Sequence, residues 1–148
     1  MKQSVFLISM LILTAALLGW SGNYAALKYN SCKTEIDSIT KKLIYTVADT
    51  EPMNEGGKSR LLRELERNIV TSNFEIDTTN HDPNVIVAFI VDNDGSIKGE
   101  RIINDKTQKV GKQMLDIIMS LKWTPAKCNG KLVPMLIKQK LVIDIMEN

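Results

Sequence analysis

Hydrophobic side chains recur with helical spacing in two parts of the chain. Over residues 58–70, leucine and isoleucine form a stripe among good helix formers, which predicts an amphipathic helix. Over residues 110–121, a second apolar stripe has the same period. Trp123-Thr124-Pro125 follows it and predicts the end of this helix, because proline cannot continue a helix and biases Thr124 toward extended geometry.

Other segments have the periodicity and composition of strands. Residues 43–47 are rich in β-branched and aromatic side chains, which favour a strand. Residues 85–91 are apolar on both faces, which is typical of a central strand. Residues 96–103 return from the turn Asp92-Asn93-Asp94-Gly95 and are more polar, as expected where one face of a strand meets water.

A long final strand is predicted over residues 131–145, after the hairpin signal Asn129-Gly130. Pro134 has no N–H to donate, so this strand is expected at a sheet edge there. The order strand, helix, strand, strand, helix, strand predicts an α+β domain, with two helices packed on one face of an antiparallel sheet of three to four strands. The side chains expected to pack together in its core are Leu65, Phe89, Ile118 and Trp123.

The amino-terminal segment is expected to be an export signal or a membrane anchor. Residues 5–20 are apolar apart from Ser9, Thr14 and Gly19, and they follow a short positive start. The run is slightly short for a spanning helix, which takes about 20 residues, so a cleaved signal and an uncleaved anchor both stay open, with a lipoprotein as a third alternative. The expected location is periplasmic, secreted or anchored to the inner membrane.

The chain divides on this basis into a signal peptide or anchor at residues 1–20, a short tether at residues 21–42 and one folded domain at residues 43–147. Within the tether, Ile36, Ile39 and Leu43 recur at helical spacing and suggest a short helix.

Charge and candidate chemistry argue against several classes of function. Nineteen basic residues stand against 17 acidic ones, and the aromatic share is 5%, so a nucleic-acid-binding surface is not expected. No nucleophile, base and orienting group can be assembled, so we expect no enzyme, no cofactor and no metal site. His81, the one histidine, lacks partners for a metal or catalytic site.

Two cysteines, Cys32 and Cys128, fit an oxidising compartment. A disulfide between them would tie the tether to the last hairpin. Two unpaired thiols are the alternative, because sequence alone cannot place the two Cα atoms within bridging distance.

Several segments occur in a characteristic order and spacing: Pro52-Met53-Asn54-Glu55-Gly56-Gly57, the hairpin around Asp92-Asn93-Asp94-Gly95, Leu115-Asp116, Trp123-Thr124-Pro125-Ala126, and Asn129-Gly130-Lys131 with Val133-Pro134. Together they resemble the carboxy-terminal domain of the TonB energy-transducer family, in its Pro-x-x-x-Gly-Gly variant, over about two-thirds of the chain. This chain departs from the family in having Asn54 where an aromatic residue is usual, and in lacking a long Pro-rich spacer.

The resemblance implies an envelope protein-binding module that binds an extended peptide of an outer-membrane transporter by β-augmentation. It also implies energy-coupled transport with an inner-membrane proton-channel complex. The alternative is an accessory or structural periplasmic protein that keeps the fold and self-associates, for example as a homodimer, without energy transduction. Known transducers of this family need a long Pro-rich spacer to reach the outer membrane. The absence of such a spacer here therefore distinguishes the two alternatives. Contact with the membrane is expected only through the amino-terminal segment.

The last strand is the expected binding edge, because lysines on an open edge discourage indiscriminate pairing. A proline at Gln139 is therefore expected to abolish pairing and leave the core intact. The residues expected to bind the partner are Met135, Ile137, Lys138, Gln139, Lys140 and Leu141.

Overall fold

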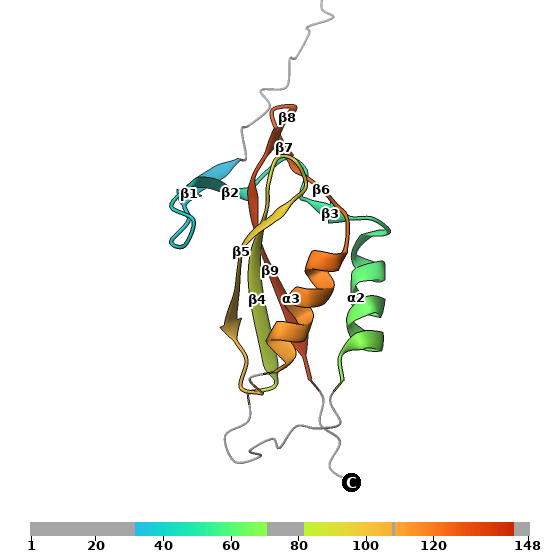
Figure 1. Cartoon of the computed structure of the whole chain (residues 1–148). Coiled ribbons are helices and arrows are strands. Elements are labelled where there is room, and N and C mark those ends of the chain that lie inside the picture. Colours follow the sequence, from blue (N-terminus) through green and yellow to red (C-terminus); the bar gives the residue numbers. More distant parts are fainter. Residues whose placement is uncertain (1–31, 71–81, 108, 144–148) are drawn as a thin grey trace, which may run out of the picture.

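The computed structural model describes residues 32–70, 82–107 and 109–143, which form an α+β fold (Figure 1). The expected signal or anchor, residues 21–31 of the tether and His81 lie outside these ranges. The elements in chain order are β1 (Lys33–Ile36), β2 (Leu43–Val47), β3 (Met53–Asn54), α2 (Gly57–Asn68), β4 (Asn84–Val91), β5 (Ile97–Asn104), α3 (Val110–Ser120), β6 (Trp123–Thr124), β7 (Ala126–Cys128), β8 (Lys131–Val133) and β9 (Met135–Val142). Within the described ranges, neither helix has the length and apolar character needed to span a bilayer.

The main sheet is mixed, with the strand order β1-β2-β9-β4-β5. β1 pairs antiparallel with β2, and β4 pairs antiparallel with both β9 and β5. β2 runs parallel to β9 and meets it at the single pair Tyr45 and Met135. The α+β class is confirmed, but the expectation of an antiparallel sheet of three to four strands is wrong. No hairpin turn links β2 to β9, so local turn chemistry does not dictate their relative direction.

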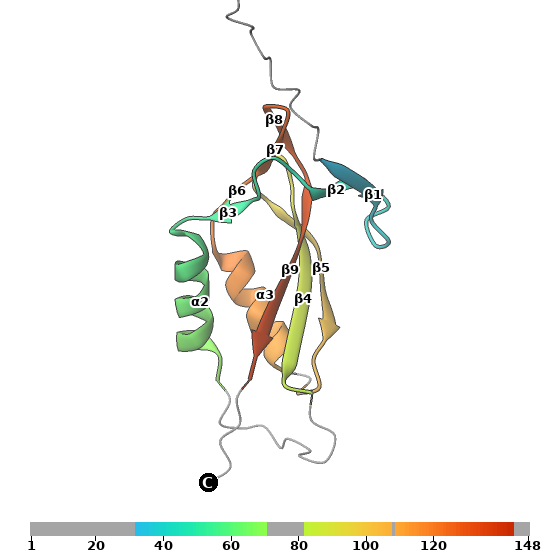
Figure 2. The same cartoon turned by 180° about the vertical axis from the view of Figure 1, so that it is seen from behind.

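Both helices cover one face of β4 and β9, as the two opposite views show (Figures 1 and 2). The core lies between this face and the helices, and it includes the fully buried Leu65, Phe89 and Ile118. The Phe89 ring meets the Trp123 ring edge-to-face, with 5.2 Å between the ring centroids. The Trp123 indole N–H donates to the carbonyl of Ile118 at 3.0 Å. The predicted core grouping is therefore confirmed.

The segment before β2 belongs to the folded domain from Cys32 onward. Where a short helix was expected, Ile36 of β1 lies opposite Leu43 of β2, and residues 37–42 form the turn between the two strands. The Asp37 side chain is buried in this turn and forms an ion pair with Arg101 of β5 at 2.8 Å. The helical spacing of the apolar residues did not decide the local structure, because strand pairing and a long-range ion pair hold this segment.

The carboxylate of Asp37 is held in its ionised form. One oxygen accepts hydrogen bonds from the Thr40 N–H at 2.7 Å, the Thr40 hydroxyl at 2.9 Å and the Ile39 N–H at 3.2 Å. These bonds, above all the one from the Thr40 N–H, together with the Arg101 charge, keep the pKa of Asp37 below its usual value, although burial acts in the opposite direction. The group therefore stabilises the fold above about pH 4, and its contribution is lost as the pH falls through the lower folded pKa.

Replacing Arg101 with methionine is expected to lower the free energy of unfolding by about 1–3 kcal/mol at pH 7, because the buried Asp37 carboxylate loses a charge-assisted hydrogen bond. Urea unfolding at a series of pH values from 7 downward measures the effect, which should shrink as the pH falls through the lowered pKa of Asp37. Glu100→Gln, on the same strand, is the control and should change little. An Arg101→Met effect that stays the same size while the pH falls through the lowered pKa of Asp37 would contradict this role of the ion pair.

Candidate partner-binding edge

β9 has a neighbouring strand on both sides only at its beginning. The Tyr45 N–H of β2 donates to the carbonyl of Pro134 at 2.8 Å, next to the pair of Tyr45 and Met135. From residue 136 to residue 142, β9 pairs with β4 alone among the described strands. Pro134 divides the expected long strand into β8 and β9. The Pro134 carbonyl accepts its hydrogen bond from β2. The edge is thus open after Pro134, not at it as expected.

Two hydrogen bonds fix which backbone groups of β9 face the open side. The Ile143 N–H donates to the carbonyl of Pro83, on the β4 side, at 2.9 Å, whereas the Pro134 carbonyl faces β2. Backbone direction alternates along an antiparallel strand, so odd-numbered residues of β9 point toward β4 and even-numbered residues point away. The residues whose N–H and C=O groups point away from β4 are Leu136, Lys138, Lys140 and Val142.

Lys138 and Lys140 are the open positions in the middle of this side, since Leu136 adjoins the contact with β2. Their side chains are exposed. By contrast, Gln139 lies opposite Val87 and directs its N–H toward β4. A proline at Gln139 would break the central ladder, so the expectation that it would leave the core intact is wrong.

The Gln139 side chain forms a hydrogen bond to a backbone group on the open side. Its Nε2 donates to the carbonyl of Lys140 at 2.9 Å. This carbonyl is one of the acceptors that an added strand would use. The Gln139 amide therefore satisfies an edge acceptor that pairs with no second strand among the described residues, and an incoming strand must replace that bond.

The six residues expected to bind a partner lie on one strand but have different surroundings. Lys138 and Lys140 present both backbone and side chain to the exterior. Met135 is buried, and Ile137 and Leu141 pack against the core beneath the helices. Of the six, Lys138 and Lys140 therefore form the exposed surface, and the half-buried Gln139 lies between them in the chain.

A cleft of about 520 Å³ borders the first half of the open side. β9 forms one wall, and β3 and the start of α2 form the other; its apolar lining includes Met53, Leu61 and Trp123. Asn54 also lines it and is only 4% exposed. The Asn54 Nδ2 donates to the carbonyl of Glu55 at 3.2 Å, and its Oδ1 accepts no hydrogen bond from the residues that the structure describes. Sequence reasoning did not identify this cleft.

The two glycines after β3 hold this wall in place. β3 pairs with β6, which places Asn54 opposite Trp123, and the Glu55 N–H donates to the carbonyl of Lys122 at 2.9 Å. The chain then turns into α2 through Gly56 and Gly57, with φ values of 89° and 72°. A side chain at Gly56 would also place its Cβ 2.6 Å from the Arg60 side chain. Glycine is required here because other residues rarely adopt such φ values.

A disulfide joins Cys32 to Cys128, with the Cα atoms 6.3 Å apart, which confirms the bonded alternative. It links the start of β1 to β7. The Asp49 carboxylate accepts a hydrogen bond from the Asn129 N–H at 2.7 Å. It also lies near both sulfur atoms, with the three candidate ligand atoms within 4.8 Å of one another. While the sulfurs are bonded to each other, they are not thiolate ligands for a metal.

The other two edges of the main sheet are poor templates for an added strand. β1 has four residues. β5 pairs with β4 through two register shifts, and Gly99 within it has a φ of 59°. Bulges of this kind disrupt the ladder and twist an edge away. β9 pairs with β4 in unbroken register, so among the described strands it offers the regular open side.

Comparison with known proteins adds no relative: no family model matches the chain, and no curated protein and no solved structure matches it.

Proposed function

We propose that this chain is a protein-binding module that receives an extended segment of a partner along the open side of β9. The observation that supports it is the regular backbone at Lys138 and Lys140, which pairs with no second strand among the described residues and lies beside an apolar cleft. In β-augmentation, main-chain hydrogen bonds supply affinity and pockets for alternate side chains supply specificity. No catalytic group is needed for this function.

An added strand would present its side chains alternately to two different surroundings. Those on the helix side enter the cleft near Leu61 and Trp123. Those on the other side lie beside Lys138 and Lys140, whose side chains share the face opposite the helices. The resemblance to the TonB family suggests a segment of an outer-membrane transporter as the partner, and energy coupling through an inner-membrane complex belongs to the same proposal.

Self-association through the same edge is the second candidate, and charge disfavours it. In an antiparallel pairing of two β9 strands, the open positions of one copy lie opposite those of the other. The registers that align residues 136–142 place Lys138 opposite Lys140, or one of these lysines opposite its own copy. Like charges directly opposite each other destabilise a strand pair. A separate partner is therefore the favoured occupant.

Replacing Lys140 with proline is expected to abolish partner binding and leave the domain folded. The substitution removes an N–H that faces the open side, where proline is tolerated. Heptapeptides selected from a displayed library on the oxidised chain serve as the probe. We expect their affinity to fall at least about tenfold for Lys140→Pro, which corresponds to about 1.4 kcal/mol, and much less for Lys140→Ala.

Gln139→Pro is the matched control at the neighbouring position with opposite backbone direction. It should lower thermal stability, because it removes a hydrogen bond between β9 and β4. If folded Lys140→Pro bound the selected peptides as the unmodified chain does, the open side of β9 would not be the binding edge. The same selected peptides, used as competitors in pull-downs from envelope extracts, would lead to the natural partner.

A further inference from the structure

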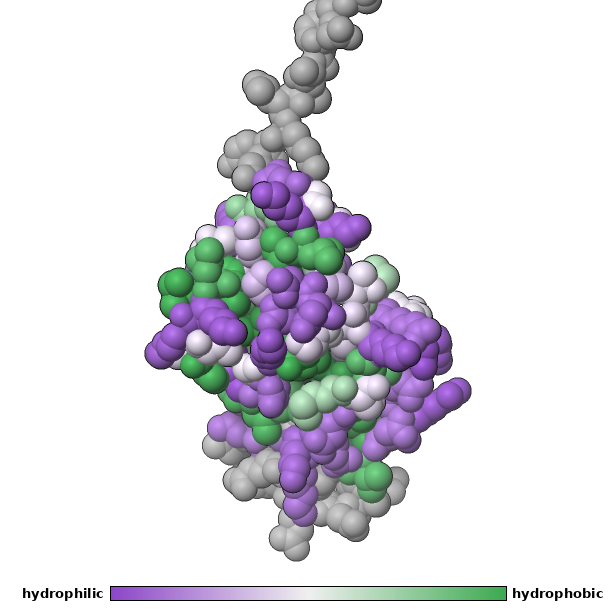
Figure 3. Space-filling view, turned by 45° about the horizontal axis from the view of Figure 1, so that its top comes forward, coloured by the Kyte–Doolittle hydropathy of each residue, from purple (hydrophilic) through white to green (hydrophobic). Residues whose placement is uncertain are grey.

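The β1–β2 hairpin exposes three large apolar side chains, here called the apolar tip: Ile36, Ile39 and Leu43, which are 62%, 55% and 55% exposed. Ile36 and Leu43 are a cross-strand pair and so share one face of the hairpin, and Ile39 lies in the turn between them. Figure 3 shows hydrophobic surface at the left, over this hairpin, with hydrophilic side chains beside it. None of the three side chains belongs to the core clusters.

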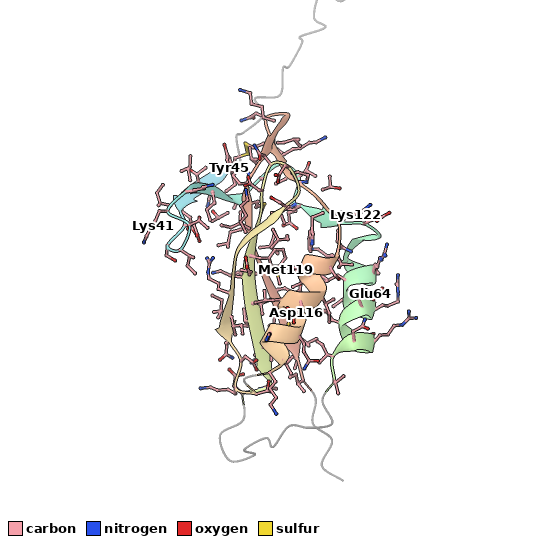
Figure 4. The ribbon with its side chains drawn as sticks, viewed as in Figure 1. Lys41, Tyr45, Glu64, Asp116, Met119 and Lys122 are labelled. Atoms are coloured by element: carbon pink, nitrogen blue, oxygen red, sulfur yellow. A yellow bond between two sulfur atoms is a disulfide. The ribbon has the colours of Figure 1, made fainter. Side chains whose placement is uncertain are left out.

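Two lysines, Lys41 and Lys42, directly precede Leu43 of the apolar tip, and a third, Lys33, lies at the other end of β1. Lys33, Lys41 and Lys42 are all exposed, and Figure 4 places Lys41 at the outer end of the hairpin. The acidic residue of the turn, Asp37, is buried and paired with Arg101, so it does not offset these charges at the surface. Glu35 is the exposed carboxylate of the hairpin, which leaves a surplus of positive charge around the tip.

The fold holds the apolar tip in a fixed position. Two backbone hydrogen bonds close the turn, from the Asp37 N–H to the Lys42 carbonyl at 2.9 Å and from the Lys41 N–H to the Asp37 carbonyl at 3.0 Å. The ion pair with Arg101 ties the turn to β5, and the disulfide of Cys32 ties the start of β1 to β7. Exposure of apolar side chains to water is unfavourable, and an exposed apolar surface that the fold holds in place is typical of an interaction site.

Both the charge and the position in the chain point to a membrane surface as the occupant. Lysine side chains can lie at anionic headgroups while neighbouring apolar side chains enter the boundary with the acyl chains. The apolar run of residues 5–20 precedes the hairpin in sequence. The residues between that run and Cys32 span at most about 40 Å when extended. An anchored run would therefore keep the hairpin close to the bilayer.

We propose that the apolar tip docks onto the anionic surface of a lipid bilayer. The opposite side of the same hairpin, with Glu35 and Thr46, lines the cleft beside β9. Side chains of successive strand residues point to opposite faces, so docking through Ile36 leaves the side that carries Glu35 free. Membrane contact and strand addition use different faces, and the inference does not depend on the proposed function.

The test uses the full chain reconstituted in vesicles with a tryptophan at the tip, Ile39→Trp, and brominated lipids as quenchers. Leu62→Trp is the matched control, because Leu62 is 45% exposed on α2. Emission of the unmodified chain is subtracted to remove the native tryptophans. In vesicles with about one-third anionic lipid, we expect quenching at the tip to be at least about twice that at the control position. Leu43→Trp is a second tip reporter and should agree.

Charge provides the second arm of this experiment. Quenching at the tip should fall to the control level in purely zwitterionic vesicles, and also when Lys41→Glu and Lys42→Glu are combined with the tip reporter. Equal quenching at tip and control, or tip quenching that is the same in both lipids, would overturn the proposal. A concentration-dependent blue shift of the tip reporter in the absence of lipid would assign the surface to a second copy of the chain and would also overturn it.

Discussion

Replacing Phe89 with alanine is expected to lower the free energy of unfolding by about 3–5 kcal/mol. The Phe89 side chain is fully buried on the central strand β4, and it packs against both helices and the Trp123 ring. The cost combines lost burial with the cavity that remains, because the two helices and the sheet can collapse only partly around it. Natural domains are stable by about 5–15 kcal/mol, so this loss would bring the domain close to unfolding.

Urea unfolding followed by far-UV circular dichroism measures this effect. Ile103→Ala is the control, since Ile103 is 52% exposed on β5, and it should cost less than about 0.5–1 kcal/mol. Trp123→Ala should also be costly, because it removes the edge-to-face contact and the indole hydrogen bond to Ile118. A loss below about 1 kcal/mol for Phe89→Ala would mean that the core does not pack around this ring.

Removing the disulfide by Cys32→Ser together with Cys128→Ser is expected to lower the free energy of unfolding by about 2–5 kcal/mol. The two cysteines are 96 residues apart in sequence. A cross-link that closes so long a loop strongly restricts the unfolded chain, which is worth about 4.7 kcal/mol for a loop of 100 residues in the chain-entropy treatment. In the folded state, the bond also holds the start of β1 to β7.

Unfolding of the unmodified chain with and without reductant supplies the matched comparison. The reduced chain and the double serine variant should have the same unfolding midpoint, well below that of the oxidised chain. Hydrogen exchange should increase most in β1 and in the turn of residues 37–42, which the disulfide and the Asp37 ion pair hold to the domain. An unfolding midpoint that does not respond to reductant would contradict a stabilising role for this bond.

The alternating side chains of β9 predicted only part of the candidate site. The alternation of Lys138 and Lys140 with less polar residues predicted an open edge on the last strand. It did not indicate which backbone groups were already bonded to a neighbour. The expectation that a proline at Gln139 would leave the core intact overlooked the pairing with β4, because the side-chain pattern reports which face is buried and not which edge is paired.

The sequence by itself determined the elements that depend on local signals. Both helices, the central strand β4 and the turn at Asn129 follow from periodicity and turn chemistry, which act between residues close in the chain. The core of Phe89 and Trp123 also follows, because apolar faces of neighbouring elements must be buried together.

Only the tertiary structure decided the features that depend on distant pairings. These are the parallel contact of β2 with β9, the strand β1 in place of a short helix, the pairing of the two cysteines and the open side of β9. Each is a choice among partners that lie far apart in the chain. The period of a segment is the same whichever strand it pairs with and in whichever direction, so hydrogen-bond partners are fixed only when the whole chain is packed.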